Sequence, residues 1–190
     1  MARTTVIPHT THNHSCREVE RTSETVIVPR RLLDEARRRG IDVEEVVLRA
    51  LAETLNLDPN ELAWARLELA EKTLREAEEY LAKGDTVQAS EKLYKTVEEC
   101  IKLLAQLYKL PEHEKATREG RWWTQLLGKA ARRLSKRFSE PRIADAWARA
   151  YDIHVWGSHE AKYDAEDIRE DLQYAKWLIE YVKKLLAKTK

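Results

Sequence analysis

Apolar residues recur along most of the chain in alternating steps of four and three, the spacing that places side chains on one face of an α-helix. The clearest stripe runs through residues 63–81, and similar stripes follow at 90–108, 123–138, 143–154 and 168–186. Beyond residue 30 the alternation typical of strands is missing. Five amphipathic helices with short connections predict a mainly α-helical chain folded as an antiparallel up-and-down bundle.

Residues that start and stop helices stand between these stripes. Asp58, Asp85 and Asp164 each precede a stripe and are predicted to cap the helix that follows. Pro111 is predicted to end the second helix, because proline in a helix interior removes a hydrogen bond. Residues 111–121 are therefore predicted to form a charged connection between helices.

The beginning of the chain departs from this pattern. Residues 1–23 are polar and are predicted to form a disordered arm. Residues 24–57 are predicted to form a small strand-helix-helix unit, with a β-branched strand at 25–28 that Pro29 closes. The helical bundle is then expected to occupy residues 58–190.

The predicted strand at 25–28 needs a backbone partner, because a lone short strand leaves its N–H and C=O groups unpaired. A second copy of the chain would supply that partner, and the sequence on this basis predicts a homodimer. Arg30, Arg31 and residues 37–39 would then be placed to touch a phosphate backbone. The alternative is that the unit folds onto the bundle.

Composition and charge narrow the class of protein. Charged residues make up 35% of the 190 residues, well above the usual quarter, with only five Gly and five Pro, which suits long exposed helices. High charge with one Met and two Cys points to a thermophilic source. The net charge of +1 does not indicate what kind of partner the protein binds, so any electrostatic attraction of a ligand must come from local charged patches.

Targeting and redox features are absent from the sequence pattern. Cys16 and Cys100 form no CxxC motif and indicate no disulfide framework. No apolar run approaches the ~20 residues needed to cross a bilayer, and residues 1–21 lack the apolar core of a signal peptide. These observations predict a cytoplasmic protein with no membrane partner.

Three segments carry a family resemblance: residues 85–95 (DTVQASEKLYK), 119–123 (EGRWW) and 154–162 (HVWGSHEAK). Together they make residues 63–186 resemble the HEPN superfamily, and more closely the archaeal PaREP1-type family. The resemblance implies a helical bundle. In many HEPN proteins an Arg-x4–6-His motif implies metal-independent RNA cleavage, often by a dimeric toxin. Other HEPN relatives lack the motif and only bind nucleotide or RNA.

Arg149 and His154 fit the motif, although Ala150 stands where a polar residue usually follows the arginine. In such a catalytic pair the histidine takes a proton from a 2′-hydroxyl and the arginine holds the phosphate. Five residues at ~100° each place the two side chains about 140° apart, so they converge only at a helix break near Asp152 or across a dimer axis. Alternatively, His154 is a core residue and Arg149 belongs to an ion-pair ladder with Asp145 and Asp152.

A second polar cluster is predicted from Asp152, His159 and Glu160, which lie near Gly157. Histidine with a carboxylate suits acid–base chemistry, and the alternative is a polar cap on the end of the bundle. No HExxH pattern occurs, and the histidines and cysteine near the start of the chain have no second half of a zinc motif. Neither a metal nor a cofactor is therefore predicted.

Residues 118–142 hold eight cationic and two acidic residues, a local net charge of +6. Cations that attract phosphates, combined with aromatic rings that stack on bases, are typical of proteins that hold single-stranded RNA. The predicted nucleic-acid-binding residues are Arg118, Arg121, Trp122, Lys129, Arg132, Arg133, Lys136 and Arg137. The alternative is a solvated face paired with the acidic residues at 68–79, with Trp123 in the core.

The leading hypothesis is a HEPN-like homodimer that binds RNA or nucleotide. RNA cleavage by a metal-independent endoribonuclease of toxin–antitoxin type is a further step of that hypothesis. One alternative is a non-catalytic scaffold that contacts only protein partners. Another is a DNA-binding regulator, because residues 25–55 also resemble a ribbon-helix-helix module.

Overall fold

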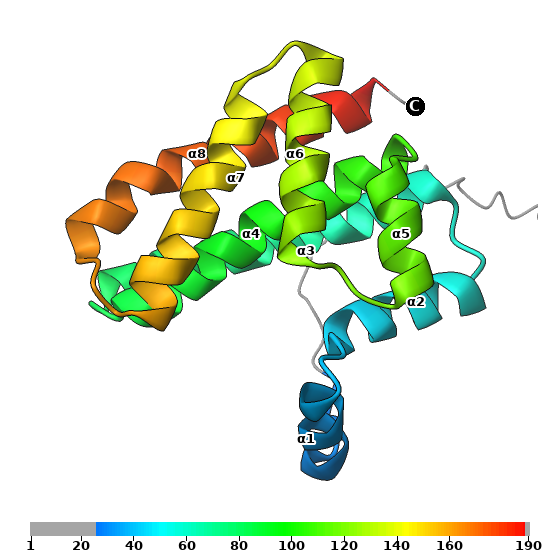
Figure 1. The fold of residues 1–190 in the computed structure, drawn as a ribbon, viewed down its shortest axis with the longest axis horizontal. Coiled ribbons are helices and arrows are strands. Elements are labelled where there is room, and N and C mark those ends of the chain that lie inside the picture. Colours follow the sequence, from blue (N-terminus) through cyan, green and yellow to red (C-terminus); the bar gives the residue numbers. More distant parts are fainter. Residues whose placement is uncertain (1–25, 189–190) are drawn as a thin grey trace, which may run out of the picture.

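The computed structural model describes residues 26–188, and nearly all of them are helical (Figure 1). The mainly α-helical prediction is therefore confirmed. The elements are α1 (Arg30–Arg38), α2 (Val43–Thr54), α3 (Pro59–Ala82), α4 (Thr86–Leu107), α5 (Pro111–Glu119), α6 (Thr124–Phe138), α7 (Arg142–Ile153), the π-helical turn η1 (His154–His159) and α8 (Ala165–Ala187).

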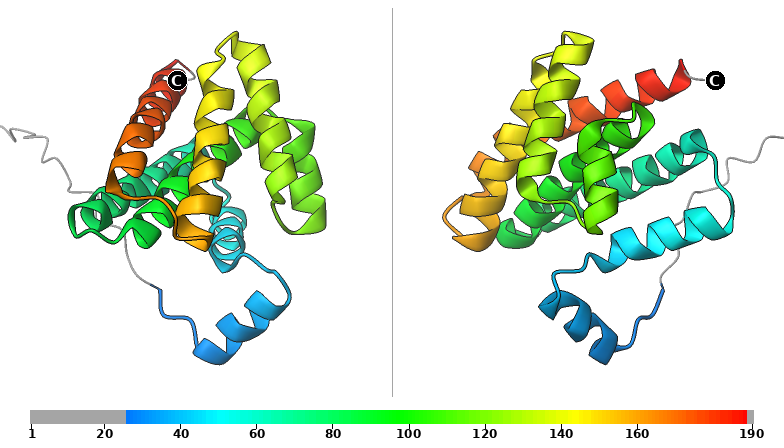
Figure 2. Two further views of the ribbon diagram at one scale, coloured as in Figure 1. Left: turned by 60° about the vertical axis from the view of Figure 1, so that its left-hand side comes forward. Right: turned by 45° about the vertical axis from the view of Figure 1, so that its right-hand side comes forward.

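Helix α4 is the centre of the molecule. It contacts α3, α5, α6, α7, η1 and α8, and 14 of its 22 residues are buried. In Figures 1 and 2, α6 and α7 form a hairpin that crosses α4, while α8 lies against α3 and α4. Leu93, Ile101 and Leu104 of α4 therefore lie in the middle of the apolar core, to which α3, α6, α7 and α8 also contribute side chains.

The predicted caps hold the ends of three long helices. Asp58 and Asp164 each form a capping box with the residue three positions on, and the Asp85 side chain accepts a hydrogen bond from the Gln88 N–H. These contacts satisfy N–H groups that a helix leaves free in its first turn. The sequence signals for the starts of α3, α4 and α8 are thus confirmed.

The connection predicted at 111–121 is wrong, because most of this segment forms α5. Pro111 occupies the first helical position, where the missing N–H costs nothing and the fixed φ suits a helix. Gly120 then ends α5 with a φ of 70°, a conformation that glycine adopts without strain. Pro111 therefore both ends one helix and begins the next.

The strand predicted at 25–28 is not found where the structure describes that segment. Residues 26–29 are extended but belong to no strand, and Thr25 lies outside the described residues, as does the arm predicted at 1–23. Within residues 26–188 no other strand exists that could pair with them. The two predicted helices of this N-terminal unit are present as α1 and α2.

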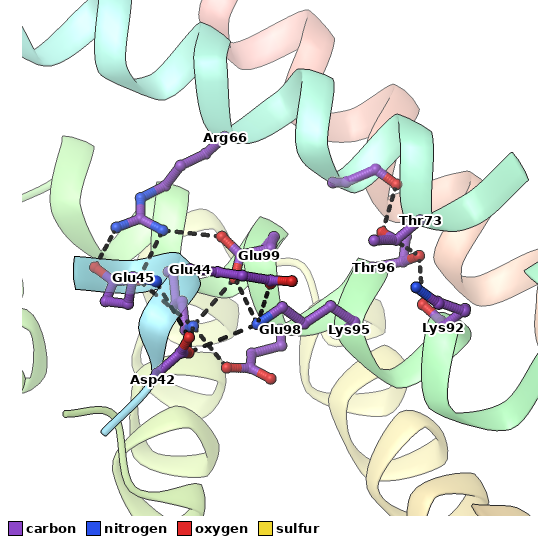
Figure 3. Close-up of polar contacts among 12 residues, drawn as sticks. Asp42, Glu44, Glu45, Arg66, Thr73, Lys92, Lys95, Thr96, Glu98 and Glu99 are labelled. Carbon is purple, nitrogen blue, oxygen red and sulfur yellow. Dashed lines mark hydrogen bonds and ion pairs between the residues drawn. The ribbon is translucent and has the colours of Figure 1, made fainter. Parts of the chain in front are cut away.

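A cluster of charged side chains, rather than an apolar interface, fixes α2 to the body. Helix α1 buries no residue and α2 buries only Ala52. At the start of α2, however, Asp42 and Glu45 reach Lys102 at 3.5 Å each, and Glu45 also pairs with Arg66 at 2.5 Å (Figure 3). These contacts position the start of α2 against α3 and α4.

The centre of this cluster is buried. Arg66, Glu99 and Lys102 are only 3%, 2% and 1% exposed. Arg66 binds Glu99 at 2.9 Å, and Lys102 binds Glu99 at 3.1 Å. Burial raises the pKa of Glu99, but the charges of Lys102 and Arg66 outweigh it and hold that pKa below its usual range. Charges without partners could not be buried here, so the cluster is satisfied as a unit.

Candidate functional site

The predicted catalytic residues Arg149 and His154 bind different helices. Arg149 on α7 donates to Asp171 of α8 at 2.5 Å, and its guanidinium lies 4.5 Å from the centre of the Tyr174 ring. His154 instead turns toward α4, where its Nδ1 lies 2.9 Å from Glu91 Oε2. The two side chains leave the same helix in different directions, as their spacing of five residues requires.

The backbone around His154 has an unusual form. Helix α7 widens at residues 154–159 into the π-helical turn η1, a form that occurs frequently at functional sites. Gly157 permits η1 to approach α4 closely, because a Cβ added there would lie 2.2 Å from Ser90 Oγ. The structure therefore requires glycine at this contact, and it places the side chains of η1 beside the start of α4.

Four polar side chains meet in this place. His154 Nε2 lies 2.9 Å from His159 Nε2, and the Ser158 hydroxyl donates to Glu91 Oε2 at 3.2 Å. When His154 is neutral, its Nδ1–H donates to Glu91 and its Nε2 accepts from the Nε2–H of His159. We call Glu91, His154, Ser158 and His159 the paired-histidine cluster.

The surroundings hold the cluster in position. The ring of His154 stacks on Tyr94, with centroids 4.1 Å apart and planes inclined by 19°. The hydrogen bond from His154 lowers the pKa of Glu91 despite the opposing effect of burial. A charged carboxylate behind a histidine fixes the orientation of the ring, which is the arrangement of a general base and its orienting group.

Sequence reasoning placed some of these residues and missed others. His159 joins His154, whereas Asp152 accepts a hydrogen bond from the Tyr163 hydroxyl, outside the cluster. Glu160 is exposed and forms no ion pair with any residue in 26–188. Glu91 was missed because it lies 63 positions before His154 in the chain, and no local sequence pattern links the two residues.

Five of the seven cationic residues predicted to bind nucleic acid lie on one exposed face of α6. Helix α6 contains five cationic residues and no acidic one. Lys129, Arg132 and Lys136 are exposed and form no ion pair within the described part of the chain. Arg133 pairs with Glu112 at 3.1 Å and Arg137 lies 4.8 Å from the Tyr108 ring centre, but both remain exposed.

Three of the acidic residues at 68–79, which the alternative interpretation paired with this face, bind cations on other helices. On α3, Glu71 pairs with Lys183 at 2.9 Å and Glu78 with Lys176 at 2.6 Å, both from α8. Glu76 pairs with Lys92 of α4 at 2.6 Å. Helix α6 therefore keeps its positive charge.

Trp122 and Trp123 precede α6, and the apolar stripe predicted that Trp123 lies in the core. The structure instead places Trp123 at the surface. Trp123 is the N-cap residue of α6 and is 39% exposed, while Trp122 is half-buried beside His113. Arg121 lies 3.6 Å from the Trp123 ring centre, which combines a cation and an exposed aromatic surface. Arg118 is exposed one turn earlier, at the end of α5. The cap position explains why the stripe pattern misassigned Trp123.

Two kinds of feature are absent from residues 26–188. No three or more His, Cys, Asp or Glu side chains in this range are arranged to hold a metal ion. None of the helices there combines the length and apolar character needed to cross a membrane. The histidines and Cys16 near the start of the chain lie outside the described residues.

Comparison with known proteins identifies the family. A crystal structure of a Sulfolobus solfataricus protein is 36% identical, with a TM-score of 0.54, and the match covers 60% of this chain and 93% of that protein. No curated protein sequence matches the chain. The model of the archaeal PaREP1/PaREP8 family matches residues 65–179, which is more than half of the chain. The matched range begins within α3 and ends within α8. The chain therefore belongs to the archaeal PaREP1/PaREP8 family.

Proposed function

We propose that this protein binds single-stranded RNA along the exposed face of α6. The observation that carries the proposal is the group of Lys129, Arg132 and Lys136, which are exposed, positive and without ion-pair partners in residues 26–188. These positions are three and four residues apart, so they follow one line along the helix. A line of free cations attracts a phosphate backbone and releases its counterions.

Aromatic surface beside the cations favours a single strand over a duplex. Trp123 is exposed at the start of α6 and lies against Arg121. An exposed indole offers a stacking surface for an unpaired base, which a base pair inside a duplex cannot use. Unstructured RNA is therefore the proposed ligand, and the phosphates would follow α6 from Trp123 toward Lys136.

The test is fluorescence anisotropy with a labelled, unstructured RNA, with Lys129, Arg132 and Lys136 all changed to Gln. A matched control changes Arg75, Arg169 and Lys184 to Gln, which removes the same charge from exposed positions on α3 and α8. The proposal expects the α6 variant to bind at least ten times more weakly than wild type and the control to bind within about twofold. Equal weakening in both variants would show only a general charge effect and would overturn the proposal.

Cleavage of the bound RNA is a second candidate function, and the paired-histidine cluster favours it. In the proposed reaction the hydrogen bond between His154 and His159 opens, and the 2′-oxygen attacks the adjacent phosphorus while His154 Nε2 takes the hydroxyl proton. The bond from phosphorus to the 5′-oxygen breaks, and protonated His159 donates a proton to that oxygen. Arg149, predicted to hold the phosphate, would have to exchange Asp171 for it.

A cleavage assay with end-labelled RNA tests this second function. Loss of product in His154→Ala and in Glu91→Gln is expected, because Glu91 positions His154. Glu180→Gln is the control, since Glu180 is an exposed carboxylate on α8, away from η1 and from the face of α6. The expected products end in a 2′,3′-cyclic phosphate and a 5′-hydroxyl. Cleavage by His154→Ala at the wild-type rate would exclude the cluster as the site.

We also propose that the chain is a homodimer joined through its N-terminal unit. Seven of the ten exposed large hydrophobic side chains in residues 26–188 lie between Val26 and Leu55, a concentration that usually marks an interface. A contact across a two-fold axis would cover these side chains in both copies at once.

Sedimentation velocity of the full chain tests this contact with Ile27→Asp, a residue that is 91% exposed. Tyr151→Asp, at an exposed aromatic on α7, is the control. A dimer that Ile27→Asp alone dissociates is expected. A monomeric wild type at about 100 μM, above the range of typical specific affinities, would contradict the dimer. The HEPN relationship, the up-and-down bundle, a cytoplasmic location and a toxin–antitoxin role belong to the same proposal.

A further inference from the structure

A cavity of about 580 Å³ lies between α2 and the helices α3, α4 and α5, and no sequence pattern predicts it. Its volume falls within the range of sites that hold small organic ligands. Residues of α2 and of the α2–α3 connection form one wall, α3 and α4 form the floor, and α5 forms the opposite wall. Glu53, Asn56 and Thr117 on its rim are exposed while Arg66 on its floor is buried, so the cavity opens to solvent.

Hydrogen bonds and ion pairs hold the side chains at the floor of the cavity in position. Arg66 donates to Gln106 Oε1 at 3.1 Å and to Glu45 and Glu99, as part of the buried charged cluster (Figure 3). Because Gln106 Oε1 accepts from Arg66, the orientation of its amide is fixed. The amide NH2 of Gln106 has no hydrogen-bond partner in residues 26–188, so two donors are free at the floor.

The free polar groups of the walls carry no charge. Burial, and then the charge of Arg66, lower the pKa of His113, so this imidazole is neutral near pH 7 and offers one donor and one acceptor. Thr117 adds a hydroxyl and Asn56 adds an amide. The charged groups of the lining pair with each other, Arg66 with Glu45 and Arg49 with Glu53. An ionic group entering the cavity would meet no unpaired opposite charge.

These features select a neutral, planar ligand rich in donors and acceptors. Ala52, Leu57 and Leu62 provide apolar contact for the faces of a ring, while the amides and imidazole provide contact for its edge. A nucleobase has this chemistry. The cavity also adjoins the cationic residues, because Arg118 follows the wall residue Thr117 and Trp122 packs beside His113.

We propose that this cavity holds one unstacked nucleobase of the bound strand, with its phosphate outside near Arg118. The proposal deepens the proposed RNA binding and rests on it for the ligand class. It is a separate site from the paired-histidine cluster, because Glu91 and Gln106 are fifteen residues apart on α4, about 22 Å along the helix. Helix α2 of the N-terminal unit thereby completes a binding site that residues 65–179, the range matched by the family model, do not form on their own.

Ligand-observed NMR with the four 5′-mononucleotides tests the cavity directly, using the full chain. Thr117→Trp fills the cavity from its exposed rim, and Thr54→Trp places the same side chain on an exposed position of α2 outside the lining. Saturation transfer to base protons of at least one nucleotide is expected, with binding at least tenfold weaker in Thr117→Trp and unchanged in Thr54→Trp. Ribose 5-phosphate, which lacks a base, is expected not to compete.

The outcomes separate this proposal from RNA binding by α6. Nucleotide binding that survives Thr117→Trp, or no binding of any nucleotide at millimolar concentration, overturns the cavity proposal. RNA binding that persists without nucleotide binding leaves the α6 proposal intact and removes the cavity. Nucleotide binding that persists in the variant with Gln at 129, 132 and 136, while the wild type fails to bind RNA, supports the cavity and removes the α6 proposal.

Discussion

Replacing Lys102 with Met removes the central charge of the buried cluster while keeping most of the side chain's volume. The Lys102 Nζ lies 2.6 Å from Glu98, 3.1 Å from Glu99 and 3.5 Å from both Asp42 and Glu45. Breaking a buried ion pair by removing one partner typically costs about 3–5 kcal/mol, because the remaining charge is left uncompensated. We therefore expect Lys102→Met to lower the free energy of unfolding by about that amount at pH 7.

The effect should depend on pH in a defined direction. In the wild type the pKa of Glu99 is lowered, so its contribution is present above about pH 4 and is lost as pH falls through the folded value. Without Lys102 the neighbouring carboxylates bind protons more readily in the folded state. Protonation reduces the repulsion among these carboxylates in the folded variant. The difference in free energy of unfolding between Lys102→Met and wild type should therefore shrink between pH 7 and pH 5.

Urea unfolding followed by circular dichroism measures both effects. Lys183→Met is the control, because Lys183 also bridges two carboxylates, Glu71 and Glu180, but at the surface where such pairs are screened. The control is expected to cost less than about 1 kcal/mol. Equal costs in the two variants, or a cost in Lys102→Met that does not change with pH, would refute the account of the cluster.

Three further predictions concern other parts of the fold. Leu104→Ala should cost about 2–5 kcal/mol in the same urea assay, since Leu104 is fully buried in the last turns of α4; a cost below about 1 kcal/mol would contradict its place in the core. Gly157→Ala should destabilise the protein through its clash with Ser90, and Ser90→Gly in the same chain should restore much of the loss; additive effects would argue against the contact. Glu91→Gln should be less stable than wild type at pH 7 but not at pH 3, because the hydrogen bond from His154 lowers the pKa of Glu91 and its contribution disappears as pH falls through that value; a difference that is constant with pH would contradict this.

Helix positions could be predicted from the sequence because the information is local. The stripes at 63–81 and 168–186 and the caps at Asp58 and Asp164 each lie within a few residues of the structure they specify. Pro111 shows the limit of local signals, because a proline is compatible both with the end of one helix and with the start of another. The tertiary contacts of α5 determine that a second helix begins there.

Burial of charge could not be predicted, because it depends on partners far apart in sequence. Glu99 and Lys102 read as solvent-exposed residues on an amphipathic helix, yet they are among the most buried side chains of α4. Their burial is tolerated only because Arg66 from α3 and Asp42 from the N-terminal unit arrive at the same place. A single sequence shows which residues are charged but not which of them meet.

In the candidate site, too, features confined to one helix could be predicted and contacts between helices could not. The cationic run from Lys129 to Lys136 is visible in the sequence because it lies on one helix. The partners of His154 and Arg149 are not visible, since Glu91 and Asp171 come from other helices. A motif defined by spacing along the chain therefore singled out two residues without showing which groups they contact.

The central claim is that the phosphates of an RNA strand bind the free cations of α6. Its most direct test is the salt dependence of the dissociation constant between 50 and 200 mM salt, for wild type and for the variant with Lys129, Arg132 and Lys136 changed to Gln. Each phosphate contact on a single strand contributes ~0.7 to the slope of log K against log salt concentration. The account predicts a slope shallower by about 2 in the variant, with the change absent from the control lacking Arg75, Arg169 and Lys184. Equal slopes in the wild type and the α6 variant would contradict it.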